Sequence, residues 1–250
     1  MKIIVESKQI FGKISVENIG AQFLNQNVDE LRFLGKIGVD TRFLSVYHSN
    51  IFINNQRFSK FTRKREEQFL RNYPDFKVHR SGLFQRLCTR ASRVLASSIK
   101  PREKILVPTD NSCTDFALKI ILEPYKRKYG IQILSGNIAN FEPAEYDSIA
   151  MATTLDDEAV HILNRLFNGE KMDVVHEINT HKMDHKLIYP LQNVPSSWIM
   201  EWIENLGQEC EFSIQTNYEL ETLSFLGNFV GDVRENILKS ALFISENSIK

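Results

Sequence analysis

The stretch KILVPTDNSCTDFAL, residues 104–118, decides the fold of this chain of 250 residues. It places a short buried strand, Lys104–Val107, before a polar loop and a helix that Ser112 can cap and that runs toward Lys128. Two more strands are expected over 131–134 and 146–152. Strands that alternate with helices favour a parallel sheet. The sequence therefore predicts an α/β domain over residues 104–250.

The second informative stretch is ATTLDDEAVHILNRLFNG, residues 152–169. Thr154 is expected to open a helix, and Gly169 to end it. The apolar residues recur with the 3.6-residue period of one helical face. This stripe comprises Ala159, Ile162, Leu163, Leu166 and Phe167. Two later helices, one capped by Ser196 or Ser197 and one beginning near Asp232, predict a helical C-terminal part.

The first hundred residues divide into two segments. Residues 1–56 are predicted to form a small β-rich segment, with strands over 2–11, 13–17 and 43–53 and a helix over 22–34. Their order resembles the β-grasp fold of small sulfur-carrier proteins, although the terminal Gly-Gly of those carriers is absent. Residues 57–103 are predicted to be basic and helical, with a break at Tyr73-Pro74.

Charge is distributed unevenly along a chain whose net charge is zero. Between Arg57 and Lys104 there are 14 Lys and Arg residues against four Asp and Glu. Arg86, Arg90 and Arg93 recur at helical spacing and share one face. A basic band suits a polyanion such as RNA, and a solvated basic helix is the alternative.

The cysteine content and the hydropathy of the sequence indicate the cellular compartment of the protein. The three cysteines include no CxxC pair and suggest no disulfide framework, which is typical of a reducing cytosol. No apolar run reaches the roughly 18 residues of a membrane span, and no signal peptide is recognisable. We therefore expect a cytoplasmic protein without a membrane partner.

Three segments in order resemble the PP-loop ATPase family, in its tRNA 2-thiolation branch. Residues 104–118 stand where that family has a strand, an SGGxDS loop and a helix. The LDDEA of residues 155–159 is similar to the family's TGHNLDDEA, and residues 187–195 are similar to its KPL element. Glu209-Cys210 falls at the family's ECP motif, and Arg234 at its late arginine-containing helix. The resemblance implies a PP-loop domain of the adenine nucleotide alpha hydrolase type.

The first motif departs from the family where nucleotide binding needs it most. Glycines let the family's loop curl, so that N–H groups at a helix N-terminus face the pyrophosphate of ATP. Here Asp110, Asn111, Ser112 and Asp115 occupy the loop, and no glycine is present. Asp110 brings a carboxylate to the place of a polyphosphate, whereas Ser112 and Asp115 have the spacing of a capping box. We expect a degenerate loop that does not hydrolyse ATP.

The second motif has two interpretations. Asp157 matches a family residue linked to ATP and magnesium, and Asp156 stands beside it. Thr154 and Asp157 also have capping-box spacing, and acidic residues in a first helical turn complement the helix dipole. The family's Gly-His pair is missing. ATP and Mg²⁺ are therefore the alternative cofactors, and no cofactor is the main expectation.

The cysteines and histidines are the remaining candidates for chemistry. Cys210 matches the family's late cysteine, but a lone thiolate cannot hold an iron–sulfur cluster. Cys210 is therefore expected to be a buried small residue, with a catalytic role as the alternative. Cys113 lies at an expected helix N-terminus. His176, His181 and His185 have spacings that a zinc site could use, but they lie in a polar connector, and no metal is predicted.

Two functions follow from the resemblance. The first is a non-catalytic subunit in the 2-thiolation of tRNA uridines, because eukaryotic complexes of this family pair an active PP-loop subunit with a degenerate one. The sheet domain would then provide the surface for the active subunit, and Arg86, Arg90 and Arg93 would hold tRNA. The second is an active ATP-dependent enzyme that adenylates a tRNA uridine through a divergent loop.

Overall fold

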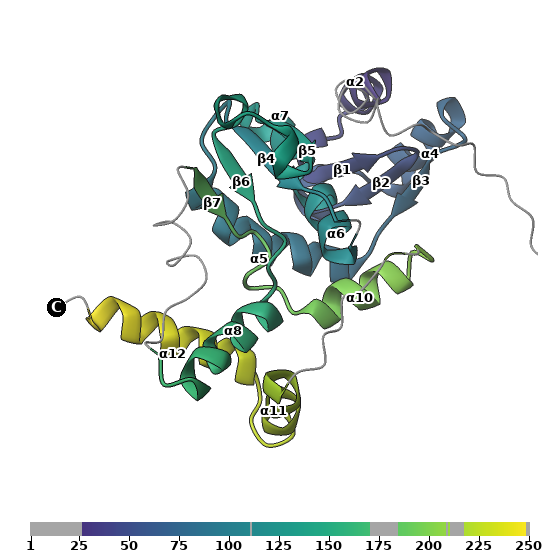
Figure 1. Ribbon diagram of the computed structural model, residues 1–250. Helices are drawn as coiled ribbons and strands as arrows, with labels where there is room; N and C mark the ends of the chain where they lie inside the picture. The colour runs from purple at the N-terminus through teal and green to yellow at the C-terminus, as the bar shows by residue number, and fades with distance from the viewer. Residues whose placement is uncertain (1–26, 111, 171–184, 209, 211–217, 249–250) are drawn as a thin grey trace, which may run out of the picture.

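The computed structural model describes residues 27–110, 112–170, 185–208, 210 and 218–248. They form two sheets with helices around them, and a group of helices at the C-terminal end (Figure 1). The helical group lies below the larger sheet in that view, and the smaller sheet lies beside it. The predicted strands over 2–11 and 13–17, and with them the likeness to a β-grasp fold, lie outside the described residues.

The larger sheet confirms the predicted α/β class. It has the strand order β5-β4-β6-β7, and every described pairing is parallel. Its members are β4 (Lys104–Pro108), β5 (Gln132–Gly136), β6 (Ser148–Ala150) and β7 (Lys186–Ile188). Ile105 and Val107 of β4 join the main hydrophobic core, whereas Leu106 faces a second cluster with Tyr146 and Ile149. The alternation shows that both faces of β4 are covered, as parallel strands require.

Three helices cover one face of this sheet. They are α5 (Gly82–Ser98), α6 (Cys113–Leu122) and α10 (Ser196–Glu204). The helix expected from Ser112 to Lys128 is two helices, because Pro124 follows α6 and a new helix, α7 (Tyr125–Tyr129), begins there. The main core lies between these helices and the sheet and includes the fully buried Trp202. On the other face, Ile138 of the short 3-10 helix η3 (Ile138–Asn140) and the following Phe141 pack against the second cluster, and a further 3-10 helix, η4 (Pro143–Glu145), lies exposed after them.

The smaller sheet differs from the sequence prediction in two ways. The strand expected over 43–53 is a hairpin of β1 (Leu44–Tyr47) and β2 (Asn50–Ile53), which turns at His48 with φ of 49°. A third strand, β3 (Lys77–His79), pairs in parallel with β2 and comes from the segment expected to be helical. The pattern was too short to reveal it, because three residues show no clear period.

Four helical elements surround the smaller sheet. They are α2 (Val28–Lys36), η2 (Thr41–Phe43), α3 (Gln56–Ser59) and α4 (Arg63–Asn72). Leu34, Phe61 and Phe69 are fully buried in the hydrophobic core of this unit. Strand β2 also contacts α5, so that the two sheets share a packed boundary.

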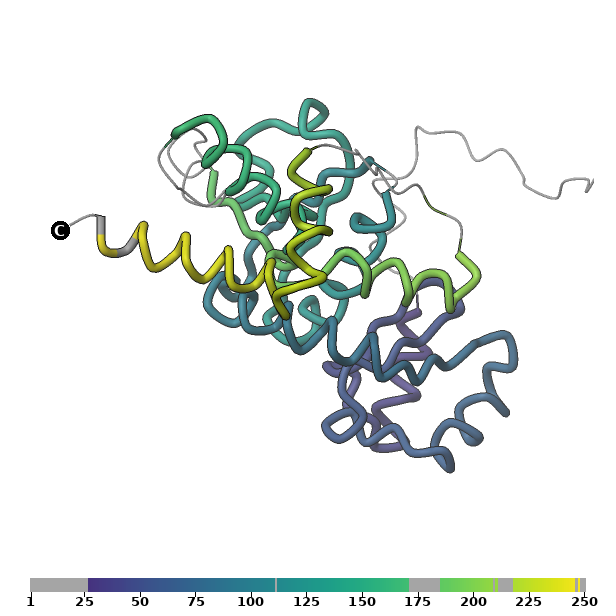
Figure 2. The backbone as a smooth tube through the Cα atoms, turned by 90° about the horizontal axis from the view of Figure 1, so that it is seen from below, coloured from purple at the N-terminus to yellow at the C-terminus, as the bar shows by residue number. Residues whose placement is uncertain are grey.

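The C-terminal helices pack on α8 (Leu155–Phe167), which begins after the predicted cap Thr154. They are α11 (Tyr218–Gly227) and α12 (Val233–Ser248). Figure 2 shows α12 extending away from the N-terminal unit, which lies at the opposite end of the molecule. Leu155 and Ile162 of α8 meet Leu238 of α12. Leu166 and Phe167 depart from the predicted buried stripe, being 43% and 50% exposed.

No helix in the described part of the chain combines the length and the apolar character that a bilayer crossing needs.

Candidate nucleotide site and basic helix

The loops of the two sequence motifs meet at one edge of the larger sheet. The loop over 109–112 follows β4, and the loop over 151–154 follows β6. These strands are neighbours and parallel, so their carboxyl ends lie at the same edge. Strand β5 lies on the other side of β4, which makes the gap between β4 and β6 a point where the strand order reverses. Such points are where open α/β sheets bind ligands.

The first loop is closed by its own side chains. Asp110 Oδ1 accepts a hydrogen bond of 2.9 Å from the backbone N–H of Ser112. Ser112 Oγ in turn accepts one of 3.2 Å from the N–H of Asp115, as the predicted cap requires. A carboxylate and a hydroxyl therefore occupy two amides at the α6 N-terminus. In an anion-binding loop these amides would point at the ligand.

The side chain of Asp115 does not lie where the predicted capping box would place it. Its side chain is buried and forms an ion pair with Lys119, at 3.0 Å and one helical turn further on. Nearby, burial and then the negative charge of Asp115 raise the pKa of Tyr47. Asp115 therefore belongs to the inner side of α6.

The second loop forms the predicted capping box. Asp157 Oδ2 accepts bonds from the backbone N–H and the hydroxyl of Thr154, at 2.8 and 2.7 Å. Thr154 Oγ1 accepts from the N–H of Asp157 at 3.3 Å, and it lies 2.8 Å from Ser196 Oγ. This arrangement confirms the predicted capping box, because both groups satisfy the start of α8.

Asp156 joins three helices that are distant in sequence. Its Oδ2 accepts from the N–H of Ser196 at 2.7 Å, and its Oδ1 forms an ion pair of 2.5 Å with Arg234 Nε. The residue thus connects α8 with the first residues of α10 and α12. The expected cap of α10 was wrong in this respect. Pro195 stands at the cap position, and the backbone N–H of Ser196 donates to the carboxylate of Asp156.

The cysteines correct the sequence prediction. Cys113, the first residue of α6, forms a disulfide with Cys210, which lies beyond the end of α10. Their Cα atoms are 5.2 Å apart, although 97 positions separate them in sequence. The third cysteine, Cys88, is a buried free thiol whose pKa is raised by burial. The structure therefore does contain a cysteine pairing, and it joins the first motif to the family's late cysteine position.

The three arginines of α5 share a face but have different surroundings. Arg90 is partly buried, bonds to the carbonyl of Asn193 at 2.9 Å and pairs with Glu235 at 2.6 Å. Its guanidinium also lies 4.4 Å from the Trp198 ring centre, and that of the exposed Arg86 lies 4.9 Å from it. Arg93 is exposed. Only Arg86 and Arg93 therefore present much of their charge to solvent.

Two of these contacts were not foreseen from sequence. The signal for the stacking was present as Arg86, Arg90 and a tryptophan at the start of a helix, since cation–π contacts favour Arg and Trp. The pairing of Arg90 with Glu235 had no local signal, because 145 positions separate them.

The remaining candidates fall partly outside the described residues. Asn111, His176 and His181 lie there. His185 is described, and its ring packs on Tyr146 at a centroid distance of 4.4 Å. Within the described residues, no three His, Cys, Asp or Glu side chains gather in a group that could hold a metal ion.

Comparison with known proteins places the fold. No protein-family profile and no curated protein matches the sequence. Among solved structures, the chain is similar to the U34-tRNA thiolase NcsA from Methanococcus maripaludis, described with its [4Fe-4S] cluster. The similarity has a TM-score of 0.52 at 11% sequence identity and covers 81% of this chain and 85% of the thiolase. The chain therefore has the α/β fold of this thiolase.

Proposed function

We propose that the protein is a non-catalytic subunit in the 2-thiolation of tRNA uridines, which binds tRNA and an active PP-loop subunit. The likeness in fold to a U34-tRNA thiolase supports the reaction class. The closed loop after β4 supports the absence of catalysis. The structural likeness covers 81% of this chain, so that the loop without glycine stands in a fold that is otherwise similar to that of the thiolase.

The observation that carries the proposal is the bond between Asp110 and the amide of Ser112. A phosphate approaching the N-terminus of α6 would have to displace this carboxylate or lie beside its negative charge. Asp156 and Asp157 are also engaged, the first with Arg234 and the second with Thr154. Binding of Mg²⁺ and ATP would compete with the bonds that both carboxylates make now.

Calorimetric titration with Mg²⁺–ATP tests the first part of the proposal. We expect no binding at ATP concentrations up to the millimolar range. The control is Asp110→Gly, which frees the amide of Ser112 and removes one negative charge from the loop. Micromolar binding to the wild type that Asp157→Asn abolishes, together with release of pyrophosphate in the presence of tRNA, would instead establish the active enzyme.

Binding of tRNA is supported by the basic face of α5. Arg86 and Arg93 are exposed, and we expect them to contact phosphates, whereas Arg90 holds the helices together. In a gel shift, the double substitution Arg86→Glu and Arg93→Glu should weaken tRNA binding strongly and reduce its dependence on salt. Arg32→Glu is the control, because Arg32 is exposed on α2, outside the basic band. Equal effects of both changes would contradict the proposed tRNA surface.

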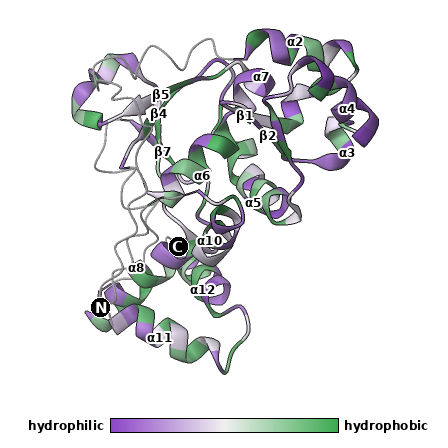
Figure 3. Cartoon of the chain, turned by 90° about the vertical axis from the view of Figure 1, so that its right-hand side faces the viewer, coloured by the Kyte–Doolittle hydropathy of each residue, from purple (hydrophilic) through white to green (hydrophobic). Residues whose placement is uncertain are grey.

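A protein partner is supported by apolar side chains at the C-terminal end. Three phenylalanines are strongly exposed. They are Phe225 of α11 (61%), Phe229 of the turn after it (73%) and Phe243 of α12 (68%). Figure 3 shows these helices at the edge of the molecule away from the four-stranded sheet. Exposed apolar patches mark interaction sites, and eight acidic residues against one basic residue over 201–235 favour a partner with basic side chains. Co-purification with an active PP-loop protein that Phe225→Ser and Phe229→Ser abolish would support this surface.

A further inference from the structure

A hollow lies between the N-terminal unit and the helices of the larger sheet, away from the loops after β4 and β6. Its volume is about 230 Å³. The N-terminal unit contributes Phe43, Asn55 and Phe58, and the helices α5 and α7 contribute Thr89 and Lys128, among others. The proposed function makes no use of this hollow. Its lining combines aromatic rings, of which that of Phe58 is exposed, with a cation and hydroxyl groups.

Two phenylalanines form an aromatic wall. The ring centres of Phe43 and Phe58 are 5.3 Å apart, and Phe58 is 52% exposed. The guanidinium of Arg57 lies 5.8 Å from the Phe58 ring centre, and Arg57 is exposed as well. An exposed ring with a cation beside it is the usual platform for a nucleic-acid base and its phosphate.

Lys128 places a cation in the hollow without an anion to balance it. Its Nζ lies 4.8 Å from the Phe43 ring centre and 4.6 Å from that of Tyr125. In the described part of the chain, Lys128 forms no ion pair or hydrogen bond through its side chain. Burial lowers the pKa of Lys128, with attraction to Asp40 acting in the opposite direction. A ligand with an acceptor atom would therefore relieve a cost that the free protein carries.

The hydroxyl groups offer the complementary chemistry. Thr89 Oγ1 donates to the carbonyl of Gln85 at 2.7 Å, and Ser92 Oγ donates to that of Thr89 at 2.9 Å. Each hydroxyl already donates its only hydrogen, so its oxygen can accept a bond from a ligand. Lys128 donates and the hydroxyls accept. A nucleobase presents both acceptors and donors along its edge.

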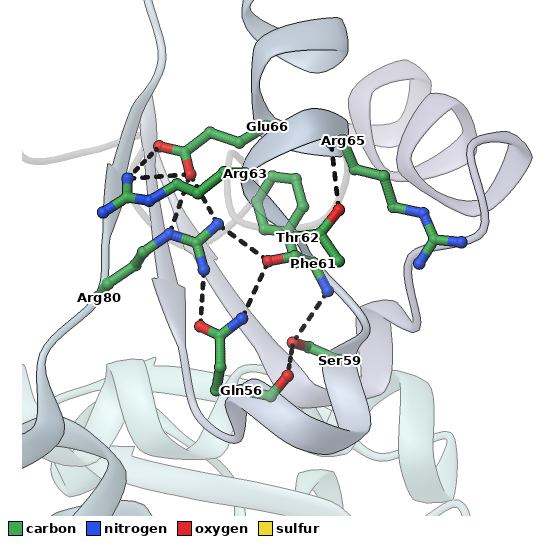
Figure 4. A network of polar contacts seen from close by, with 8 residues as sticks. All are labelled: Gln56, Ser59, Phe61, Thr62, Arg63, Arg65, Glu66 and Arg80. Carbon is green, nitrogen blue, oxygen red and sulfur yellow. Dashed lines mark hydrogen bonds and ion pairs between the residues drawn. The ribbon is translucent and has the colours of Figure 1, made fainter.

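The aromatic wall is held in place by a network of polar contacts (Figure 4). The side chain of Arg80 donates to Gln56 Oε1 at 2.6 Å and to the carbonyl of Phe61 at 2.9 Å, and it pairs with Glu66 at 2.6 Å. Gln56 Nε2 donates to the same carbonyl at 3.0 Å. Residues 56–61, which include Arg57 and Phe58, are thus fixed at both ends. A platform fixed before binding loses little conformational freedom when a ligand arrives.

We propose that this hollow binds one unpaired nucleobase of an RNA. The base would stack on Phe58, its acceptor edge would meet Lys128, and the adjoining phosphate would meet Arg57. Arg57 belongs to the basic band of residues 57–104, and this charge favours a nucleic acid over an apolar peptide. The inference deepens the proposed binding of tRNA by naming a contact to a base, which phosphate contacts alone would not provide.

The test measures the affinity of the full chain for fluorescein-labelled single-stranded RNA octamers of adenylate or uridylate, and for a blunt RNA duplex. We expect single strands to bind more tightly than the duplex. Phe58→Ala should weaken single-strand binding about 5- to 150-fold, the usual effect of removing one stacking ring. Phe167→Ala is the matched control, because Phe167 is 50% exposed on α8, close to the value for Phe58, and should leave the affinity unchanged.

The substitution Lys128→Met distinguishes an effect on RNA binding from an effect on folding. It keeps an unbranched side chain only one atom shorter and removes a cation that is costly to bury. We therefore expect single-strand affinity to fall while the thermal unfolding midpoint stays constant or rises. Unchanged affinity in both Phe58→Ala and Lys128→Met would overturn the inference. So would saturable binding of N-acetyltryptophanamide to the wild type that Phe58→Ala abolishes while RNA affinity is unaffected, since the hollow would then serve a peptide.

The proposed function and this inference fail in different ways. If tRNA binds through Arg86 and Arg93 but Phe58→Ala has no effect on any RNA, only the base site is refuted. If single strands bind and depend on Phe58 while tRNA does not bind, the base site stands and the role in tRNA thiolation is refuted.

Discussion

Two carboxylates at the edge of the larger sheet stand where the family resemblance implies nucleotide binding, but here they form bonds within the protein. Asp157 stands where the family resemblance implies ATP and magnesium chemistry, yet its oxygen accepts two bonds from Thr154. Asp110 accepts from the backbone of its own loop. The same group serves as a metal ligand or a helix cap according to which donors lie within reach.

His79 provides a residue-scale prediction about pH. The pKa of this histidine on β3 is lowered, first by burial and then by the charge of Lys77. The folded state therefore binds fewer protons than the unfolded chain at pH values below about 6.5, the ordinary pKa of histidine. The free energy of unfolding should fall as the pH decreases from there through the folded-state pKa.

His79→Gln isolates this effect. Glutamine can still bond to Asn50 Oδ1, which lies 2.8 Å from His79 Nε2, but it does not titrate. Urea unfolding at pH 7.5 and pH 5 should show a smaller loss of stability on acidification in the variant than in the wild type. An identical loss would mean that His79 titrates alike in both states.

At the scale of elements, α5 connects the parts of the molecule. Its inner residues Leu87, Ala91 and Leu95 are fully buried in the main core. On another side, Arg90 reaches α12 through Glu235 and stacks on Trp198 of α10. One helix thus contacts the sheet core and both later helices, although these are remote in sequence.

Arg90→Met should therefore lower the stability of the protein. Arg90 and Glu235 are 26% and 27% exposed, so their bond is partly shielded from solvent. Loss of this charged bond and of the bond to Asn193 should lower the free energy of unfolding by about 1–3 kcal/mol, measured by urea denaturation. Arg93→Met is the control, since Arg93 is exposed, and it should change stability little. Equal stability of the two variants would refute the linking role of Arg90.

For the whole molecule, the disulfide between Cys113 and Cys210 ties the first motif to the region after α10. A cross-link over 97 positions restricts the unfolded chain more than the folded one. Its presence also means that the oxidation state of the protein matters for its stability.

Thiol labelling and unfolding measurements check the disulfide together. Denatured protein should react with one equivalent of maleimide before reduction, at Cys88, and with three after reduction. Cys113→Ser with Cys210→Ser should lower the free energy of unfolding by about 2–4 kcal/mol, the typical contribution of a disulfide. Cys88→Ala is the control for the labelling count. Three reactive thiols in unreduced protein would contradict the pairing.

Much of the larger sheet could be predicted from sequence because its signals are local. The strand over 104–108, the cap Thr154 and the helix that follows it depend on neighbours a few residues away. The capping box at Thr154 was predictable for the same reason. The short strand β3 was not, because three residues become a strand only when β2 lies beside them.

The sequence alone determined that strands and helices alternate, that a loop without glycine follows the first strand of the larger sheet, and that positive charge gathers before it. These properties depend on residue type and spacing along the chain. Only the tertiary structure decided that Cys113 meets Cys210, that Asp156 meets Arg234, and that Phe58 and Lys128 line one hollow. Contacts of this kind depend on how distant elements pack, and no local pattern records that packing.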